Sequence, residues 1–491
     1  MPLYGKDSGE WEDIVELYAN QDGVWVILYD SYALIQFSNY GYPIPVMAGW
    51  QYSTDKVTWT VVDKNGTINT SGTFTGYVRA KSQLVLKDYY DFMEPGLKAT
   101  GTSLSAARSH LTSFSFDSRA FVCGGYNGGS YYSRVEYYDK NGTLTSGNNM
   151  SEGRMDLTSF ALEARATAYV CGGQSSSGYS AVTDKYDWAG NRTTGTPLSL
   201  ARSRATSFRL NNMMGFVCGG RGGTSTYATR VDVYDDAGNR TTGTALSTNT
   251  SYASSVGGNS GFVFGGETNS SYSSNVDRYS GDGTRTSATP LSLARSCTTS
   301  FTLGDKIYVC GGLIGSTSVA TRVDVYDTQG NLSTGTPLPD RVYHATSFVL
   351  DKQYGYVCGG RKYNTVNNYF YTSSVVYVYD TAGNVTTGSP LNTGTHNATS
   401  FVLDNKGYVC GGVNDIDWEH LDDHDTTTYN SDTTVFYNKY IAHIPITAKS
   451  TYTLAGITGT PTVSEVLNFE AKTSGTVDYK RGSIVGANGT I

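Results

Sequence analysis

An arginine recurs at one position of this chain, ahead of a Thr-Ser-Phe motif that is itself repeated. Four members lie six residues before the Phe and one lies seven residues before it: Arg108, Arg154, Arg202, Arg295 and Arg341. A guanidinium group carries five N–H donors in one plane, so arginines around a common axis would capture an anionic ligand. Arg108, Arg202 and Arg295 are the candidates for that role. The alternative is that each guanidinium binds backbone carbonyl groups of the adjoining unit.

A second candidate site is an acidic segment near residue 420. It interleaves six carboxylates with two histidines: Asp415, Asp417, Glu419, His420, Asp422, Asp423, His424 and Asp425. Oxygen ligands on one flexible loop suit Ca²⁺, and its candidate ligands are Asp415, Asp417, Asp422 and Asp425. The segment lacks the glycine and the twelve-residue frame of an EF-hand. A solvated acidic loop is therefore the simpler interpretation, and no metal is assigned.

Tyrosine is abundant and gathers in polar loops. The sequence has 39 Tyr against 17 Phe and 6 Trp. Loops such as YNGGSYYSR, QSSSGYS and ETNSSYSSN combine Tyr with Ser, Gly and Asn, as antibody loops do, and Tyr gives such loops a rigid amphipathic surface. The candidate ligand-binding residues are Tyr131, Tyr132, Tyr179, Tyr227, Tyr272, Tyr363, Tyr369, Tyr371 and Trp418. They would suit a hydroxyl-rich ligand such as a glycan; alternatively, polar loops only keep the rim solvated.

The sequence contains no recognisable catalytic constellation. It has 6 His, and no GxSxG, HExxH or phosphate-binding loop. His110 and His344 share one repeat position, four residues before Phe, and are interpreted as structural. We therefore expect a protein that is not an enzyme and uses no cofactor. The alternative is a polysaccharide-cleaving enzyme in which the acidic segment acts together with Glu267.

An internal repeat places these candidate residues. Gly-Gly doublets follow a short apolar run seven times, 46 to 52 residues apart, beginning at Gly124, Gly172, Gly219, Gly265, Gly311, Gly359 and Gly411. Most copies have a TSF segment before the doublet, and a polar loop, an alternating strand such as VDVYD, a D-x-x-G turn and a Thr-rich segment after it. Each unit is predicted to be a four-stranded sheet. Because one such sheet is marginal by itself, neighbouring units must stack.

The doublet, the Tyr-Asp that follows it and the Arg before the next unit resemble the kelch repeat. The resemblance spans 97–440 and implies a seven-bladed β-propeller. The last copy lacks its fourth strand, whereas Leu97 to Ser109 matches the fourth-strand segment Asn191 to Ser203. This N-terminal strand should close the ring and leave no open sheet edge. The predicted fold is all-β: a seven-bladed kelch-like propeller at 96–440, with small β modules at 1–95 and 441–491.

Composition and charge narrow the possible partners. The 491-residue chain has 36 Lys and Arg against 43 Asp and Glu, and its net charge of −7 argues against nucleic-acid binding. No apolar stretch reaches the about 20 residues that cross a membrane, and no secretion signal is recognised, so we expect no membrane insertion. Six of the seven Cys precede a doublet, where we expect small buried side chains and neither disulfides nor metal ligands.

The N-terminal segment carries a shorter repeat. A Gly-x-Trp followed by Tyr-Ala occurs at Gly9, Trp11, Tyr18 and Ala19, and again at Gly23, Trp25, Tyr32 and Ala33. These tandem units resemble those of tailed-bacteriophage virion proteins. The resemblance implies a virion protein of the tail-fibre or adhesin type, assembled in the host cytoplasm. Such a protein would contact other virion proteins through 1–95, bind a host surface receptor or glycan through its propeller, and have a homotrimer as one expected state. A purely architectural virion part is the remaining alternative.

Overall fold

A computed structural model describes residues 33–40, 44–46, 51–53, 55, 57–61, 66–68, 73–80, 83–86, 90–223, 226–316, 318–364, 369–417, 426–449, 452–454, 457–459 and 464–471. The described chain is built of β-strands, with a single 3-10 turn at Glu163–Arg165. It divides into two compact units, Pro95–Tyr437 and the combination of Met1–Glu94 with Asn438–Ile491. The predicted limits of the propeller, 96 and 440, lie within a few residues of the limits of the first of these units.

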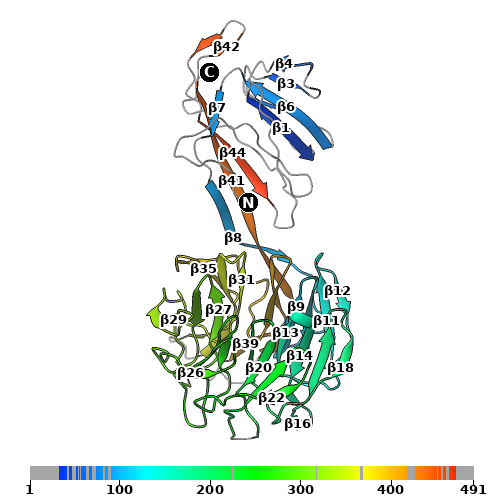
Figure 1. Cartoon of the computed structure of the whole chain (residues 1–491), viewed down its shortest axis with the longest axis vertical. Helices are drawn as coiled ribbons and strands as arrows, with labels where there is room; N and C mark the ends of the chain where they lie inside the picture. The colour runs from blue at the N-terminus through cyan, green and yellow to red at the C-terminus, as the bar shows by residue number, and fades with distance from the viewer. Residues whose placement is uncertain are drawn as a thin grey trace. The chain divides into compact units, whose positions relative to one another are not determined.

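The unit Pro95–Tyr437 is a ring of seven sheets, which we call blades 1 to 7 (Figure 1); six are four-stranded and antiparallel, and the seventh belongs to a six-stranded sheet. The strands of each blade are named A to D from the channel outward. Blades 1 to 3 consist of β9 (Thr112–Phe116), β10 (Arg119–Cys123), β11 (Val135–Asp139) and β12 (Leu144–Ser146); β13 (Thr158–Leu162), β14 (Thr167–Cys171), β17 (Thr183–Asp187) and β18 (Arg192–Thr194); and β19 (Thr206–Leu210), β20 (Met214–Cys218), β21 (Val231–Asp235) and β22 (Arg240–Thr242). The predicted all-β, seven-bladed fold is confirmed.

The other four blades repeat the same order of strands. Blades 4 to 6 consist of β23 (Ser254–Val256), β24 (Gly261–Phe264), β25 (Val276–Tyr279) and β26 (Arg285–Ser287); β27 (Thr299–Leu303), β28 (Lys306–Cys310), β29 (Val323–Tyr326) and β30 (Leu332–Thr334); and β31 (Thr346–Leu350), β32 (Tyr354–Cys358), β35 (Val376–Asp380) and β36 (Val385–Thr387). Blade 7 consists of β37 (Thr399–Leu403), β38 (Lys406–Cys410), β41 (Thr433–Lys449) and β8 (Tyr90–Thr100).

The N-terminal strand β8 supplies strand D of blade 7, as the sequence predicted. It pairs with β41, and the blue strand lies beside the orange one in Figure 1. Gly101 N donates to Thr433 O at 2.8 Å, and the equivalent Gly195 N of blade 2 donates to Thr183 O at 2.9 Å. The same connection therefore forms whether strand D comes from the end of a copy or from the start of the chain, and the ring has no open edge.

Each Gly-Gly doublet lets two connecting segments approach the end of strand B. Gly124 has φ of 69° and Gly125 has φ of 107°, a region that favours glycine. A Cβ on Gly124 would lie 2.7 Å from the Arg154 carbonyl of the next connection, and one on Gly125 would lie 2.8 Å from the Ser109 carbonyl. The doublets are therefore fixed by backbone conformation and by close packing.

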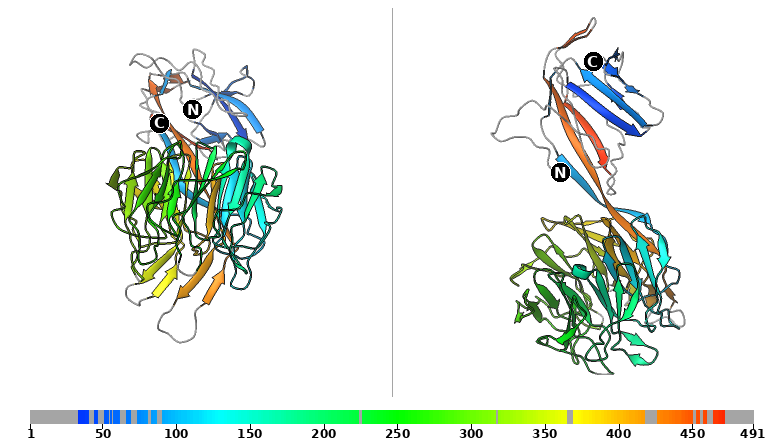
Figure 2. Two further views of the ribbon diagram at one scale, coloured as in Figure 1. Left: turned by 60° about the horizontal axis from the view of Figure 1, so that its bottom comes forward. Right: turned by 45° about the vertical axis from the view of Figure 1, so that its right-hand side comes forward.

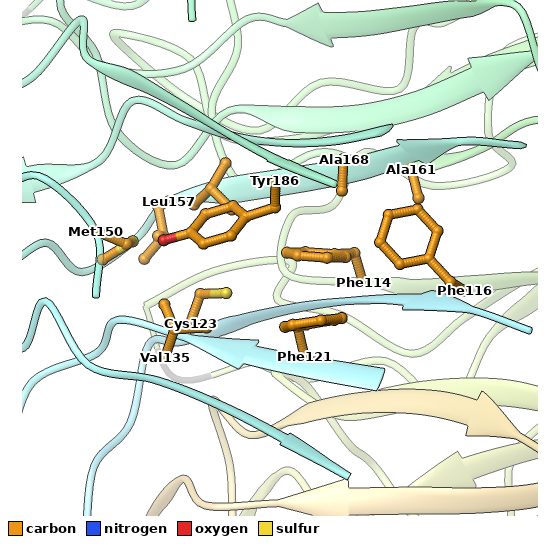
Figure 3. Packing of buried hydrophobic residues seen from close by; sticks show 11 residues of the cluster. Phe114, Phe116, Phe121, Cys123, Val135, Met150, Leu157, Ala161, Ala168 and Tyr186 are labelled. Atoms are coloured by element: carbon orange, nitrogen blue, oxygen red, sulfur yellow. The ribbon is translucent and has the colours of Figure 1, made fainter. Parts of the chain in front are cut away.

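The hydrophobic core lies between neighbouring blades (Figure 3). Phe114 stacks on Phe121 with ring centroids 4.9 Å apart, and Tyr186 of blade 2 lies 5.8 Å from Phe114. The Tyr186 hydroxyl donates to Asn148 O at 3.1 Å. The Tyr of the Tyr-Asp motif thus fills the space between two blades and bonds the segment that joins them. Cys123 packs in the same cluster, and all seven cysteines are buried, as predicted.

The Ser of the TSF motif joins neighbouring A strands around the channel. In each blade its hydroxyl donates to the carbonyl of the corresponding Ser in the preceding blade, at 2.9 to 3.2 Å. The seven residues are Ser113, Ser159, Ser207, Ser255, Ser300, Ser347 and Ser400. Because Ser113 of blade 1 donates to Ser400 of blade 7, this set of hydrogen bonds is closed.

The other unit contains strands from both ends of the chain. Its described sheets are β1 (Ala33–Tyr40), β6 (Thr73–Ala80), β3 (Gln51–Ser53) and β4 (Thr60–Val61); β2 (Ile44–Val46) with β5 (Gly66–Ile68); and β42 (Tyr452–Leu454) with β43 (Ile457–Gly459). The far end of β41 pairs with β44 (Ser464–Ala471) and with β7 (Gln83–Leu86). The tandem Gly-x-Trp units at 9–32 lie outside the described residues. No helix in the described ranges is long and apolar enough to cross a membrane.

Candidate functional site

The repeated arginines are buried inside the blades. Arg108, Arg154, Arg202 and Arg295 are 0% exposed. Each pairs with the acidic residue at the second position of strand C in its own blade: Arg108 with Glu136 at 2.7 Å, Arg154 with Asp184, Arg202 with Asp232 at 2.8 Å, and Arg295 with Asp324 at 3.0 Å. Carbonyl groups of their own blade also accept from them, for example Gly172 O from Arg154 and Val217 O from Arg202, whereas the alternative placed these carbonyls in the adjoining unit. These arginines are inaccessible, which corrects the expectation that Arg108, Arg202 and Arg295 present an anion-binding surface.

Three blades replace this arginine with a shorter side chain. Thr250 Oγ1 donates to Gly265 O at 2.9 Å in blade 4, and Thr395 Oγ1 donates to Gly411 O at 2.8 Å in blade 7. Val342 takes the position in blade 6, so Arg341 lies one residue earlier and is exposed. The arginine is thus one of several ways to anchor the same connection.

A ring of seven residues lies two positions after this one, at the end of every D–A connection. All seven adopt left-handed φ values, between 51° and 56°. Each backbone N–H donates to the carbonyl of the equivalent residue in the preceding blade, at 2.9 to 3.4 Å, and the first N–H donates to the last carbonyl. We call these residues the loop ring: His110, Asp156, Arg204, Tyr252, Cys297, His344 and Asn397.

The side chains of the loop ring are of six different types, although its backbone conformation repeats. The neighbouring Ser, Phe and Gly positions are nearly constant among the blades, whereas this position carries acidic, basic, aromatic, thiol and amide groups. Positions that stay the same in every repeat usually stabilise the fold. Positions that differ among the repeats are where binding residues are usually found. Our interpretation of His110 and His344 as purely structural was therefore incomplete. Comparison of this one position among the copies was the signal that could have revealed the site.

Contacts link the side chains of the loop ring across blades. Arg204 Nε lies 3.0 Å from Asp156 Oδ2, and the Arg204 guanidinium lies 4.6 Å from the centroid of the Tyr252 ring. Tyr252 meets His344 edge-on at 5.3 Å. Asn397 Nδ2 lies 2.9 Å from His110 Nε2 on the other side of the ring. The site is therefore an interconnected surface.

Burial sets the protonation of several groups in the loop ring. It lowers the pKa of His344 to about 3, helped by His110, and raises the pKa of Cys297 to about 12. It also raises the pKa of the Tyr252 phenol, with Asp156 contributing. At neutral pH these three side chains are uncharged and offer hydrogen-bonding and apolar surface.

Tyrosines of the B–C loops surround the loop ring. The residue after each doublet forms a β-bridge with the residue before a loop-ring position, for example Tyr126 with Ser109, so the loops and the ring share one face. Five tyrosines take one loop position, four residues before strand C: Tyr131, Tyr179, Tyr227, Tyr272 and Tyr429. All five are half-buried. The structure adds Tyr429 to the four candidates that were predicted at this position.

The tyrosines at this loop position contact other rings and charges. Tyr131 lies 4.9 Å from Tyr126, whose ring is 6.2 Å from that of Tyr429. Arg221 lies 5.7 Å from the centroid of Tyr227. Tyr132 differs, because its hydroxyl accepts from Asn127 Nδ2 at 2.7 Å within its own loop.

The long B–C loops of blades 6 and 7 join in a sheet of their own. Its strands are β33 (Arg361–Asn364), β34 (Tyr369–Thr372), β39 (Val413–Asp417) and β40 (Thr426–Tyr429). In the left view of Figure 2 these yellow and orange strands project together from the end of the propeller. We call it the loop sheet. Its presence was not predicted, because neither loop alone has enough strands to form it.

The loop sheet separates the predicted tyrosines. Phe370 packs on Tyr363 at 4.8 Å and on Tyr343 at 5.5 Å, and belongs to a cluster with Tyr252 and Cys297 of the loop ring. Because side chains alternate along a strand, Tyr369 and Tyr371 lie on the other face of β34. Of the candidates in this loop, Tyr363 is therefore the one beside the loop ring.

The predicted acidic segment is described only in part. Asp415 Oδ2 lies 3.2 Å from Arg361 Nη2, Asp415 Oδ1 accepts from Thr372 Oγ1 at 2.9 Å, and His396 Nε2 is 3.6 Å from Asp415 Oδ1. This carboxylate is committed to an ion pair. Asp417 ends β39, whereas Trp418, Asp422 and Asp425 lie outside the described residues. Where the chain is described, no three His, Cys, Asp or Glu side chains are arranged to hold a metal.

A protein-family model matches one blade of the propeller. Residues 294–333, which hold Arg295 and the strands of blade 5, match the model of the Kelch motif. The fold and this motif define a kelch-like β-propeller. The solved structure of YjhT is similar at 12% sequence identity, with a TM-score of 0.44, over 67% of this chain and 99% of that one. No curated protein matches the chain.

Proposed function

We propose that this protein is a non-enzymatic attachment protein that binds a surface glycan through the face bearing the loop ring. The single observation that carries the proposal is the chemical variety of the loop ring on an otherwise repeated frame. A sugar presents C–H groups on its faces and hydroxyls at its edge. Half-buried tyrosine rings can pack on the C–H faces of a sugar, and the surrounding Asn, Ser and backbone groups can form hydrogen bonds with its hydroxyls.

The setting of this activity follows from the N-terminal resemblance. Tandem Gly-x-Trp and Tyr-Ala units support a place in a bacteriophage virion, with 1–95 contacting other virion proteins and the propeller meeting the host receptor. Mass spectrometry of purified particles tests this placement, and light scattering tests the trimer. Detection of the chain only in the lysate and never in particles would remove the virion setting, while the glycan proposal would stand.

The glycan proposal is tested with an array and with whole host cells. Tyr131→Ala, which removes the ring that packs on Tyr126 in the cluster with Tyr429, should weaken binding at least about tenfold, as truncation of an interface anchor does. The matched control is Trp188→Ala, because Trp188 is 58% exposed and lies in a C–D turn, at the opposite end of the strands. Equal binding by Tyr131→Ala and wild type would remove the proposed face. New reducing ends on a bound polysaccharide would instead indicate the enzyme.

A further inference from the structure

The two formal charges of the loop ring neutralise each other. The guanidinium of Arg204 is paired with Asp156 at 3.0 Å and covered on one face by Tyr252 at 4.6 Å. The two side chains are 24% and 6% exposed, respectively, so the carboxylate is the more enclosed of the two. An anionic ligand group that approached Arg204 would find its guanidinium already paired with the Asp156 carboxylate.

Charges beside the loop ring are arranged in the same way. Arg361 Nη2 lies 3.2 Å from Asp415 Oδ2 where the loop sheet meets the face. On the other face of the loop sheet, which bears Tyr371, Lys362 Nζ donates to Asp340. Arg221, which follows the doublet of blade 3 and lies over Tyr227, donates from Nε to Gly223 O.

Two imidazoles near the centre are uncharged. His344 lies between the rings of Tyr252 and Tyr343, at 5.3 and 5.1 Å, and 6.3 Å from His396. Burial first, and then the neighbouring His344 and Arg361, hold the pKa of His396 well below its usual value. These imidazoles therefore act as neutral hydrogen-bonding groups at neutral pH.

We propose that the loop ring selects uncharged glycans and rejects sugars that carry carboxylate, sulfate or phosphate groups. This inference rests on the proposed function and adds the class of ligand. An acidic sugar would have to displace Asp156 from Arg204 and leave that carboxylate enclosed without its partner. A neutral sugar can accept from the imidazole and amide groups and stack on tyrosine without breaking a pair. Like charges brought together in an interface strongly disfavour the wrong ligand.

The test uses the full chain and matched pairs of oligosaccharides, such as N-acetyllactosamine and its sialylated form, on an array. We expect the neutral members to bind at least about tenfold better than the acidic ones. Their binding should not change between about 0.1 M and about 1 M NaCl, over which the screening length falls from about 10 Å to about 3 Å. Preference for acidic members, with binding that weakens in salt, would overturn this inference and leave the proposed function intact. Binding to no glycan would overturn both.

A single substitution tests the role of the pair directly. Asp156→Asn frees the positive charge of Arg204 and should raise binding of acidic members at least about tenfold. Asp305→Asn is the matched control, because it removes the same charge from an exposed A–B turn. No gain for Asp156→Asn over Asp305→Asn would contradict the proposed selection. If Asp156→Asn does not fold, as a melting curve would show, the salt series on the wild type still decides.

Discussion

The buried ion pair between Arg202 and Asp232 in blade 3 allows a quantitative test of how the blades are held. Arg202 Nη1 and Asp232 Oδ2 are 2.8 Å apart, and both side chains are 0% exposed. Blade 7 provides a natural version without charges, with Thr395 and Thr434 at the same two positions. The perturbations are Arg202→Thr, Asp232→Thr and the double change.

The structure indicates how large each effect should be. Removing one partner of a buried pair costs about 3–5 kcal/mol, because a charge is left in the interior. Arg202→Thr should fall at the low end, since Arg240 still donates to Asp232 at 2.7 Å. Asp232→Thr should fall at the high end, because the Arg202 guanidinium keeps only the carbonyls of Leu200 and Val217.

The double variant should be less unstable than the two single changes predict. Its threonines can form the bonds seen in blade 7, where Thr395 Oγ1 donates to Gly411 O and Thr434 Oγ1 accepts from Asn392 N. The free energy of unfolding should therefore exceed the additive value by at least about 2 kcal/mol. This difference is the coupling energy of the pair.

Urea unfolding of the four proteins measures this coupling, provided that their m-values agree. The control cycle uses Arg165 and Asp236, an ion pair at 3.2 Å whose side chains are 61% and 27% exposed, and should give at most about 1 kcal/mol. Additivity of the Arg202 and Asp232 changes to within about 0.5 kcal/mol would refute the reasoning.

Two further predictions concern pH and the closing strand. Because burial holds the pKa values of His344 and His396 below the usual 6.5, the unfolded chain binds more protons, so the free energy of unfolding should fall as the pH drops from 6.5 toward 4.5. His344→Asn should make the pH dependence of the free energy of unfolding shallower, because up to about one proton fewer is taken up on unfolding. Calorimetry at several pH values measures this dependence, and an unchanged slope would contradict the prediction. Gly101→Ala should cost about 1–3 kcal/mol, because its Cβ would lie 2.8 Å from Thr433 Cγ2. Gly129→Ala, whose Cβ meets nothing within 4 Å, is the control, and equal melting temperatures would contradict the predicted packing.

Much of the fold could be predicted because its determinants are local and repeated. Each doublet requires left-handed φ values and close packing, so only Gly-Gly satisfies it and the copies can be counted from the sequence. The closing strand was also predictable, since the sequence of Leu97 to Ser109 matches the strand D segment that is missing from the last copy of the repeat. The loop sheet could not be predicted, because it forms only when β34 of the blade 6 loop pairs with β39 of the blade 7 loop, for example Phe370 with Asp417.

The candidate site was predicted only in outline. The B–C face and four of its tyrosines were identified from loop composition, and the structure places them around the loop ring. The arginines remained candidates for an anion-binding mouth, with carbonyl binding as the alternative, because their spacing in the chain does not show where they point. Their acidic partners lie about thirty residues further on, and only pairing of strand C brings them together.

The sequence by itself determined the number of blades, the strand that closes the ring and the loops that share one face, because these depend on backbone conformation and on motifs that repeat in order. The tertiary structure alone decided which polar side chains are buried and which reach the ligand face. The loop ring arises from hydrogen bonds between residues 45 to 53 positions apart in the chain, and from one that joins Asn397 to His110. Proximity of that kind comes from closure of the ring, and no local pattern encodes it.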